Sequence, residues 1–280
     1  MKLTFLGTGS PEAYARRASS GYLLEIGNDR LLFDCGGGVV DRLISSGRSP
    51  ADVTHLVLSH LHSDHMLDYP RLVHGAWDAG APPLLVWGPA PIAQITDGYF
   101  GRSGVLRWDL MARTELAPSQ AVWKARGGTL PRPWPTPKVT EIGAGDPIEG
   151  DGWRIETCEV PHAQPALMCL AFRIFAGGRS LVYSGDAGTS KPFERFCAGA
   201  DMLLHWCYRL DGEEVSPEMA SLTPTPSETA AMARRAGVGK LVLTHFRVHM
   251  DARRDEALAA AAESFGGPVS VAEDLGVVEV

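Results

Sequence analysis

Four side chains that could bind a metal ion fall within six residues, His60, His62, Asp64 and His65. Imidazole nitrogens and carboxylate oxygens are the ligands that a borderline cation such as Zn²⁺ accepts. Without a cation, three imidazoles packed this closely would leave ring nitrogens that are difficult to satisfy with hydrogen bonds. We therefore predict that this run binds metal, and the alternative is a solvated histidine-rich loop.

Three further side chains of ligand type stand just past apolar runs of strand length. They are His162, Asp186 and His245. A single histidine in such a place is more often structural than a ligand. Because the ends of several strands can converge at one edge of an α/β architecture, we expect these three residues to join the histidine-rich run.

The segments that must position these residues are short and β-like. The run Thr54–Ser59 predicts a strand that ends at His60, and Lys240–Thr244 predicts one that ends at His245. Between them, Thr225-Pro226-Ser227-Glu228 has the pattern of a capped helix start. Strands, then a helix, then strands and a helix again favour an α/β fold, a four-layer αββα sandwich built from two similar halves.

Length and composition favour one large domain. The 280 residues contain 45% hydrophobic and 21% charged residues, a globular profile, so we expect a single domain over 1–280. A stretch at about 114–147 contains six prolines together with Trp123 and Trp134. Such a stretch predicts an insertion or a lid. Whether these two tryptophans line a pocket is left open.

Cysteines and charge narrow the compartment and the partners. The five cysteines are odd in number and form no CxxC pair, which argues against disulfides and against a cysteine-based zinc site. No apolar run reaches the length of a membrane span, and we expect a cytoplasmic protein. The net charge of −7 comes without a basic run, so nucleic acid is the less favoured partner and a small molecule the favoured one.

The motifs together resemble the metallo-β-lactamase superfamily, specifically its ribonuclease Z-like branch. The resemblance covers nearly the whole chain. It rests on five segments: Phe5–Ser10, Leu32–Gly36, His60–His65, Ser184–Asp186 and Leu243–Phe246.

The resemblance implies a site of two divalent metal ions, Zn²⁺ first, with Mn²⁺ or Fe²⁺ as alternatives. The first ion would be bound by His60, His62 and His162, and the second by Asp64, His65 and His245. Asp186 would bridge the two ions, and Asp34 would orient a ligand histidine. The activity implied is hydrolysis by a hydroxide held between the ions, with Asp64 and Asp186 among the catalytic residues.

The sequence departs from this branch at two positions that serve proton transfer in the family. A His-Glu-Ala stretch of the family stands here as His205-Trp206-Cys207, so the histidine matches and we predict it to be catalytic, whereas the glutamate is replaced. A second family histidine is replaced by Leu222. No long basic arm for gripping tRNA is visible. These departures favour a more apolar, small-molecule pocket.

Several functions therefore remain in competition. The leading hypothesis is a dinuclear hydrolase of a phosphodiester or a small ester, and hydrolysis of a lactone, aryl sulfate or amide is the alternative. An iron-dependent oxidoreductase and a non-catalytic binding module of the same fold are the others. The substrate, the metal, a homodimer suggested only by analogy, and whether Trp206 or His249 lines the pocket are left open.

Overall fold

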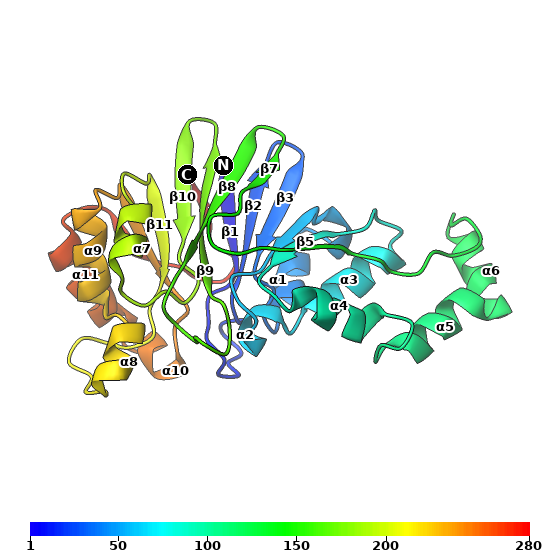
Figure 1. Cartoon of the computed structure of the whole chain (residues 1–280), viewed down its shortest axis with the longest axis horizontal. Helices are drawn as coiled ribbons and strands as arrows, with labels where there is room; N and C mark the ends of the chain where they lie inside the picture. Colours follow the sequence, from blue (N-terminus) through cyan, green and yellow to red (C-terminus); the bar gives the residue numbers. More distant parts are fainter.

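The computed structural model describes residues 1–280 and contains two seven-stranded sheets that face each other (Figure 1). The first sheet has the order β14-β1-β2-β3-β4-β5-β6: β1 Lys2–Gly7, β2 Gly21–Ile26, β3 Asp29–Phe33, β4 His55–Val57, β5 Leu85–Gly88, β6 Lys138–Glu141 and β14 Val277–Glu279. The second has the order β13-β12-β11-β10-β9-β8-β7: β7 Ile148–Gly150, β8 Trp153–Glu159, β9 Leu170–Ala176, β10 Arg179–Tyr183, β11 Met202–Trp206, β12 Lys240–Thr244 and β13 Val269–Val271.

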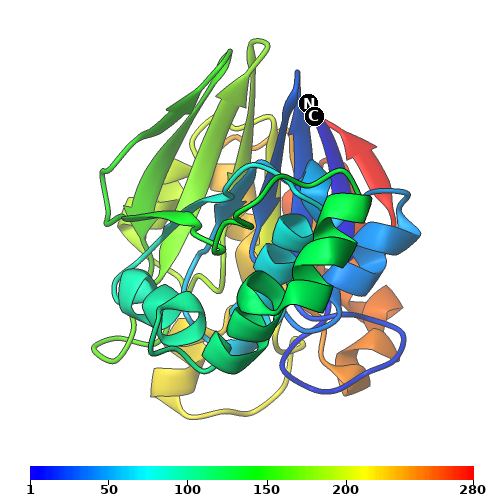
Figure 2. The same cartoon turned by 90° about the vertical axis from the view of Figure 1, so that its right-hand side faces the viewer.

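Helices cover the outer face of each sheet (Figures 1 and 2). Those on the first sheet are α1 Val39–Ser45, α3 Tyr69–Asp78 and α4 Ile92–Phe100, and those on the second are α7 Lys191–Phe196, α9 Pro226–Arg235 and α11 Arg254–Phe265. The remaining helices are η1 Pro50–Asp52, α2 Ser63–Met66, α5 Arg107–Glu115, α6 Ala117–Ala125, α8 Pro217–Leu222 and α10 Val248–Asp251. The predicted αββα layering is confirmed.

The core has three apolar layers, one between the sheets and one under each set of helices. Between the sheets, the rings of Phe33 and Phe172 have centroids 5.8 Å apart, and those of Tyr22 and Tyr183 lie 4.9 Å apart. Each pair joins one strand of the first sheet to one of the second. Aromatic pairs of this kind bury large apolar areas, so they fix how the two halves face each other.

Both sheets contain a parallel block, and this determines where the site forms. Strands β3 to β6 run parallel to one another, and so do β10 to β13. The carboxyl ends of parallel strands meet at the same edge of a sheet. Asp34 follows β3, Asp186 follows β10 and His245 follows β12, so these side chains reach a common edge.

The segment at about 114–147 is more regular than its prolines predict. Pro118 lies in the first turn of α6, where a missing N–H does no harm, and residues 138–141 pair with β5. Helices α5 and α6 project away from the body of the molecule (Figure 1). The connection between α6 and β6 and residues 142–147 are irregular. An insertion or a lid at this place stays a prediction.

The state of the cysteines agrees with the predicted absence of disulfides. All five cysteines are free, and four of them are buried. None of the helices combines the length and the apolar character needed to cross a membrane.

Candidate metal centre

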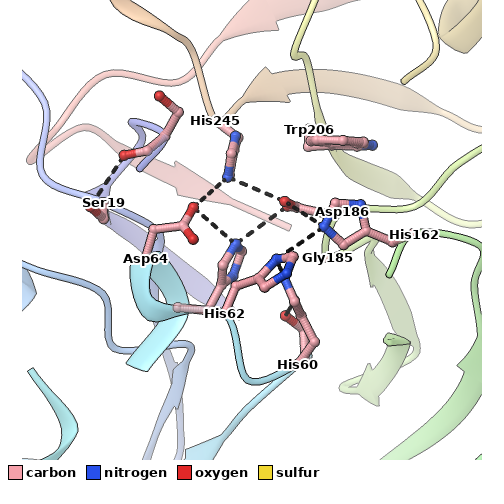
Figure 3. Close-up of polar contacts among 12 residues, drawn as sticks. Ser19, His60, His62, Asp64, His162, Gly185, Asp186, Trp206 and His245 are labelled. Carbon is pink, nitrogen blue, oxygen red and sulfur yellow. Dashed lines mark hydrogen bonds and ion pairs between the residues drawn. The ribbon is translucent and has the colours of Figure 1, made fainter. Parts of the chain in front are cut away.

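The first group of predicted ligands consists of three histidines whose nitrogens converge. His62 Nδ1 lies 3.0 Å from His60 Nε2 and 3.2 Å from His162 Nε2 (Figure 3). His60 follows β4, His62 precedes the first turn of α2, and His162 follows β8. Burial lowers the pKa of His60 and of His162, so both imidazoles stay neutral and keep a lone pair for a cation.

The second group consists of two carboxylates and two histidines, all buried. His245 Nε2 lies 3.1 Å from Asp64 Oδ2, and His65 Nε2 lies 3.5 Å from Asp64 Oδ2 and from Asp186 Oδ1. Helix α2 begins at Ser63, so its first turn delivers Asp64 and His65 side by side. The chemistry of this donor set, two imidazoles and two carboxylates, suits a divalent cation.

Asp186 lies between the two groups. Its Oδ2 is 3.4 Å from His245 Nε2 of the second group and 3.6 Å from His162 Nε2 of the first (Figure 3). The turn before Asp186 depends on Gly185, which adopts a left-handed φ of 52°. A Cβ at this residue would stand about 3.0 Å from the carbonyl oxygen of Leu170, so glycine is required there. The structure therefore brings all seven predicted ligands together, one carboxylate facing both groups.

Two buried polar atoms test whether these residues fit metal. His65 Nε2 and Asp186 Oδ1 are buried and have no hydrogen-bond partner, although they face the centre of the cluster. Burial opposes the charged form of His65, but Asp186 and Asp34 outweigh it and raise its pKa. Burial likewise opposes ionisation of Asp186, and His245 with His65 lowers its pKa nevertheless. A proton held on His65 thus occupies the place that a cation would take. The donor set fits two divalent ions.

Asp34 contacts His65 of the second group on the side away from the centre of the cluster. Its Oδ2 accepts from His65 Nδ1 at 2.7 Å, from the Ser59 hydroxyl at 2.7 Å and from the Tyr183 hydroxyl at 2.6 Å. Its Oδ1 accepts from the backbone N–H of Ser59 at 2.7 Å. This pattern fixes the His65 ring with Nε2 toward the centre, which is what an orienting carboxylate does. The sequence indicated Asp34 but not Ser59 or Tyr183, whose only signal was proximity to a ligand in the chain.

Two residues of the site have strained backbones. Asp34 has φ 57° and His245 has φ 64°, left-handed values that non-glycine residues seldom adopt. Both residues directly follow buried parallel strands, so the turn aims each side chain at the site instead of along the sheet. Strain of this kind persists where the surroundings hold the conformation.

A cavity of about 230 Å³ opens over both groups. Besides five of the predicted ligands, it is lined by Pro11, Trp206, Tyr208, Met219, Leu222 and Thr223. A hollow of about 660 Å³ lies elsewhere, against Trp153 and Arg179, and contains none of the predicted ligands. We therefore take the smaller cavity as the candidate substrate site, because the predicted ligands line it.

Other sequence-predicted residues have different surroundings. Trp206 lines the cavity, whereas Trp123, Trp134 and His249 do not. His249 pairs with Glu213 at 2.9 Å. His205 is buried, its Nδ1 lies 2.7 Å from the carbonyl oxygen of Trp206, and its ring packs on Phe193 of α7. His205 does not line the cavity, and its catalytic role stays a prediction.

Comparison with known proteins shows which family has this architecture. Residues 29–246 match the family model described as a beta-lactamase superfamily domain. The chain is 32% identical to ribonuclease Z of Mycobacterium bovis, over all of this chain and 98% of that protein. It is also 32% identical to ribonuclease Z of Mycobacterium marinum, over all of this chain and 99% of that one.

Solved structures show the same fold. The metallo-beta-lactamase fold protein YhfI from Bacillus subtilis superposes with a TM-score of 0.75 at 25% identity, over all of this chain and 99% of YhfI. The short form of human tRNase Z superposes with a TM-score of 0.70 at 20% identity, over 100% and 99% of the two chains. The family match, the full-length relatives and the seven converging ligand-type residues together confirm the resemblance. This chain belongs to the metallo-β-lactamase superfamily, in its ribonuclease Z-like branch, and is a metal-dependent hydrolase.

Proposed function

We propose that the protein is a two-metal phosphodiesterase that cleaves RNA. The observation that carries this proposal is the place of Asp186, whose carboxylate lies within 3.6 Å of a histidine of each ligand group. A carboxylate so placed can bridge two ions. Two adjacent ions are the arrangement that suits in-line displacement at phosphorus, because the attacking and leaving oxygens are both stabilised.

In this proposal His60, His62 and His162 would hold one ion, and Asp64, His65 and His245 would hold the other. Asp186, which faces both groups, would be available to both ions. Zn²⁺ is the ion that we propose, because nitrogen ligands dominate the set. Bound there, the ions would supply the nucleophile by lowering the pKa of a water and would polarise the phosphoryl group. The chain itself contributes orientation, through Asp34 on His65.

We propose RNA as the substrate, in place of the small molecule that we expected from the acidic net charge. The two mycobacterial relatives are named ribonuclease Z, which counts against that expectation. Charge is also unevenly distributed: residues 101–137, which we call the arm, contain six Lys or Arg and two Asp or Glu, whereas the remaining residues contain 20 and 31. Arg102, Arg107 and Lys124 of the arm form no ion pair, so no carboxylate of the protein neutralises their charge toward phosphates.

The second candidate is hydrolysis of a small ester. The observation that favours it is the apolar wall of the cavity, where Trp206, Met219 and Leu222 stand. An apolar wall binds aryl or alkyl groups by excluding water from them. The same wall also suits the face of a nucleobase, so it does not by itself decide between the two candidates.

The deciding experiment compares hydrolysis of a short RNA, bis(p-nitrophenyl) phosphate and p-nitrophenyl acetate by zinc-loaded protein. We expect turnover of both phosphodiesters, lost in Asp186→Asn and retained in the matched variant Asp201→Asn, whose carboxylate pairs with Arg179 away from the cavity. Turnover of the acetate alone would reject the phosphodiesterase proposal in favour of the ester hydrolase.

Charge on the arm gives a second test. Replacing Arg102, Arg107 and Lys124 with Gln should weaken RNA binding and reduce its salt dependence, by a slope of about 0.7 for each phosphate that the arm no longer neutralises. The control replaces Arg195, Arg234 and Lys240, which also form no ion pair and lie on the other half. An equal effect of both variants would mean that net charge acts, not the arm.

A cytoplasmic location belongs to the same proposal, supported by the five free cysteines, since disulfides are rare in that compartment. A homodimer stays a prediction by analogy with relatives.

A further inference from the structure

The cavity over the ligand groups offers few protons to a leaving group. Outside the predicted ligands, its lining has three side chains with a polar hydrogen: Trp206, Tyr208 and Thr223. The indole N–H of Trp206 already donates to the carbonyl oxygen of Ala187 at 2.7 Å. The hydroxyl of Thr223 already donates to the carbonyl oxygen of Met219 at 2.6 Å. Tyr208 is left as the side chain whose hydroxyl has no partner in the protein.

The surroundings of Tyr208 hold its ring in place and leave it half-buried. It stands two residues past the end of β11, and its ring packs on that of Trp206 with centroids 5.5 Å apart. Its centroid lies 6.5 Å from that of His245, a predicted ligand. The guanidinium of Arg247 lies 4.7 Å from the same ring centroid. The ring is thus in contact with an indole and a cation beside the ligand groups.

We propose that Tyr208 is a catalytic residue that protonates the leaving group. The proposal rests on the phosphodiesterase function and deepens it. A bond forms between the attacking hydroxide oxygen and phosphorus, and the bond between phosphorus and the leaving oxygen breaks. That oxygen keeps the bonding electrons and takes the proton of the Tyr208 hydroxyl, which yields an alcohol. The tyrosinate then recovers a proton from solvent, and no other reactant is needed.

The chemistry of RNA explains why a donor is needed here. Its leaving group is a ribose alkoxide, a stronger base than a phenolate, so proton transfer from a tyrosine hydroxyl runs downhill. The two positions that serve proton transfer in the resembled family hold Trp206 and Leu222 here, and neither has a proton free to give. The cavity would otherwise release an unprotonated alkoxide.

His205 and Arg247 have different places in this scheme. Burial lowers the pKa of His205 to about 4, and its Nδ1 faces the carbonyl oxygen of Trp206 away from the cavity. A histidine in that state holds no extra proton to donate near neutral pH. Arg247 is a positioning residue, because its charge over the ring attracts the π-face and favours the negative charge left after transfer. Glu12 reaches Arg247 only at 3.7 Å.

The test uses Tyr208→Phe with two substrates that differ in leaving group. The dinucleotide diuridine monophosphate releases an alkoxide, and bis(p-nitrophenyl) phosphate releases a p-nitrophenolate that needs no proton. We expect kcat/KM on the dinucleotide to fall by about 10²- to 10⁴-fold and kcat/KM on the aryl diester to stay roughly unchanged. The matched control is Tyr99→Phe, a half-buried tyrosine outside the cavity, and zinc content is measured in every variant.

A sulfur substitution adds a readout that a structural role would not move. With the leaving oxygen of the dinucleotide replaced by sulfur, the departing thiolate needs no proton, so Tyr208→Phe should recover the wild-type rate. Equal loss on all substrates would make Tyr208 a substrate-stacking or structural residue and overturn the proposal. No loss on the dinucleotide would overturn it as well.

Two further outcomes separate this proposal from those around it. If His205→Gln shows the loss that depends on the leaving group and Tyr208→Phe does not, His205 is the donor and the proposal is overturned. If wild-type protein cleaves esters but no phosphodiester, the phosphodiesterase function fails alone. In that case the same comparison, ethyl against p-nitrophenyl acetate, supports or overturns Tyr208 as donor. Absence of turnover on every substrate overturns both.

Discussion

The floor and the wall of the cavity are built in different ways. We call the seven predicted ligands the floor, although only five of them line the cavity. They follow strands or lie in the first turn of α2, and Asp34 orients one of them, His65, through a buried hydrogen bond. The wall consists of Trp206, Tyr208, Met219, Leu222 and Thr223. It comes from the end of β11, the connection after it, and α8 with its C-cap. The floor is polar and keeps buried atoms without a hydrogen-bond partner, whereas the wall is mostly apolar. We therefore expect the floor to determine the reaction and the wall to determine the substrate.

Asp34→Asn should have the largest effect, since it weakens the floor from behind. An amide at this position cannot accept all four donated hydrogen bonds that Asp34 accepts from Ser59, His65 and Tyr183. We expect zinc affinity to fall by about 100-fold, the upper range for a group that orients a metal ligand. Competition with a chromophoric chelator measures it. Unchanged affinity would mean that the floor does not depend on Asp34, and Asp201→Asn serves as the control.

Trp206 belongs to the wall but contacts residues of the floor. Its replacement therefore tests whether the wall affects metal binding by the floor. Its ring lies edge-on to His162 and to His245, with centroids 5.2 and 5.6 Å away, and its N–H holds Ala187 beside Asp186. Trp206→Leu should therefore lower zinc affinity by roughly 10-fold, less than Asp34→Asn does, through loosened ligands. The absorption spectrum of the cobalt-substituted protein reports the ligand geometry. If the spectrum of Trp206→Leu were the same as that of the wild type, Trp206 would have no effect on the ligand geometry.

Sequence and structure agree best on the floor. His60–His65 lie within six residues, and Asp186 and His245 follow short apolar strands, so local spacing was enough to predict them. The αββα layers were predictable for the same reason, since the strands and the capped helix α9 have clear local patterns. Tyr183 gave no such signal, because its contact with Asp34 depends on how the two sheets face each other. Ser59 meets Asp34 because β3 and β4 are neighbours in one sheet, a pairing that local spacing does not encode.

The wall and the arm were less predictable. Tyr208 and Thr223 meet over the ligands only because the connection after β11 folds back, which no periodicity encodes. Pro118 counted toward an irregular stretch, yet proline in the first turn of a helix is compatible with α6. The prolines from Pro131 to Pro137 do lie in an irregular connection. Charge averaged over the whole chain concealed the basic arm. Long-range contacts and the distribution of charge are therefore what the linear pattern does not encode.

Replacing the buried His205 should change the pH dependence of the unfolding free energy. Its pKa is about 4 in the folded protein and about 6.5 when exposed. As pH falls below 6.5, the unfolded chain takes up a proton that the native state refuses until about pH 4, so stability is lost across that window. Between pH 7 and 5.5 His205→Gln should lose about 1 kcal/mol less unfolding free energy than wild type. Urea titrations at the two pH values measure this. Identical pH dependence would contradict a neutral, buried His205.

The wall residues of α8 should have the smallest effect, and the effect should fall on substrate binding alone. Met219 is 45% exposed and Leu222 is half-buried, both on α8, and neither is among the predicted ligands. Ala at either position removes an apolar interaction that is equal in the ground and transition states, which raises KM and leaves kcat unchanged. We expect a rise of a few-fold in KM for aryl diesters, since loss of part of an apolar side chain from a half-exposed surface costs about 1 kcal/mol. Zinc content should stay at the wild-type value. A fall in kcat instead would show that α8 acts on the ligands or on Tyr208, and the separation of reaction from substrate between floor and wall would then be wrong.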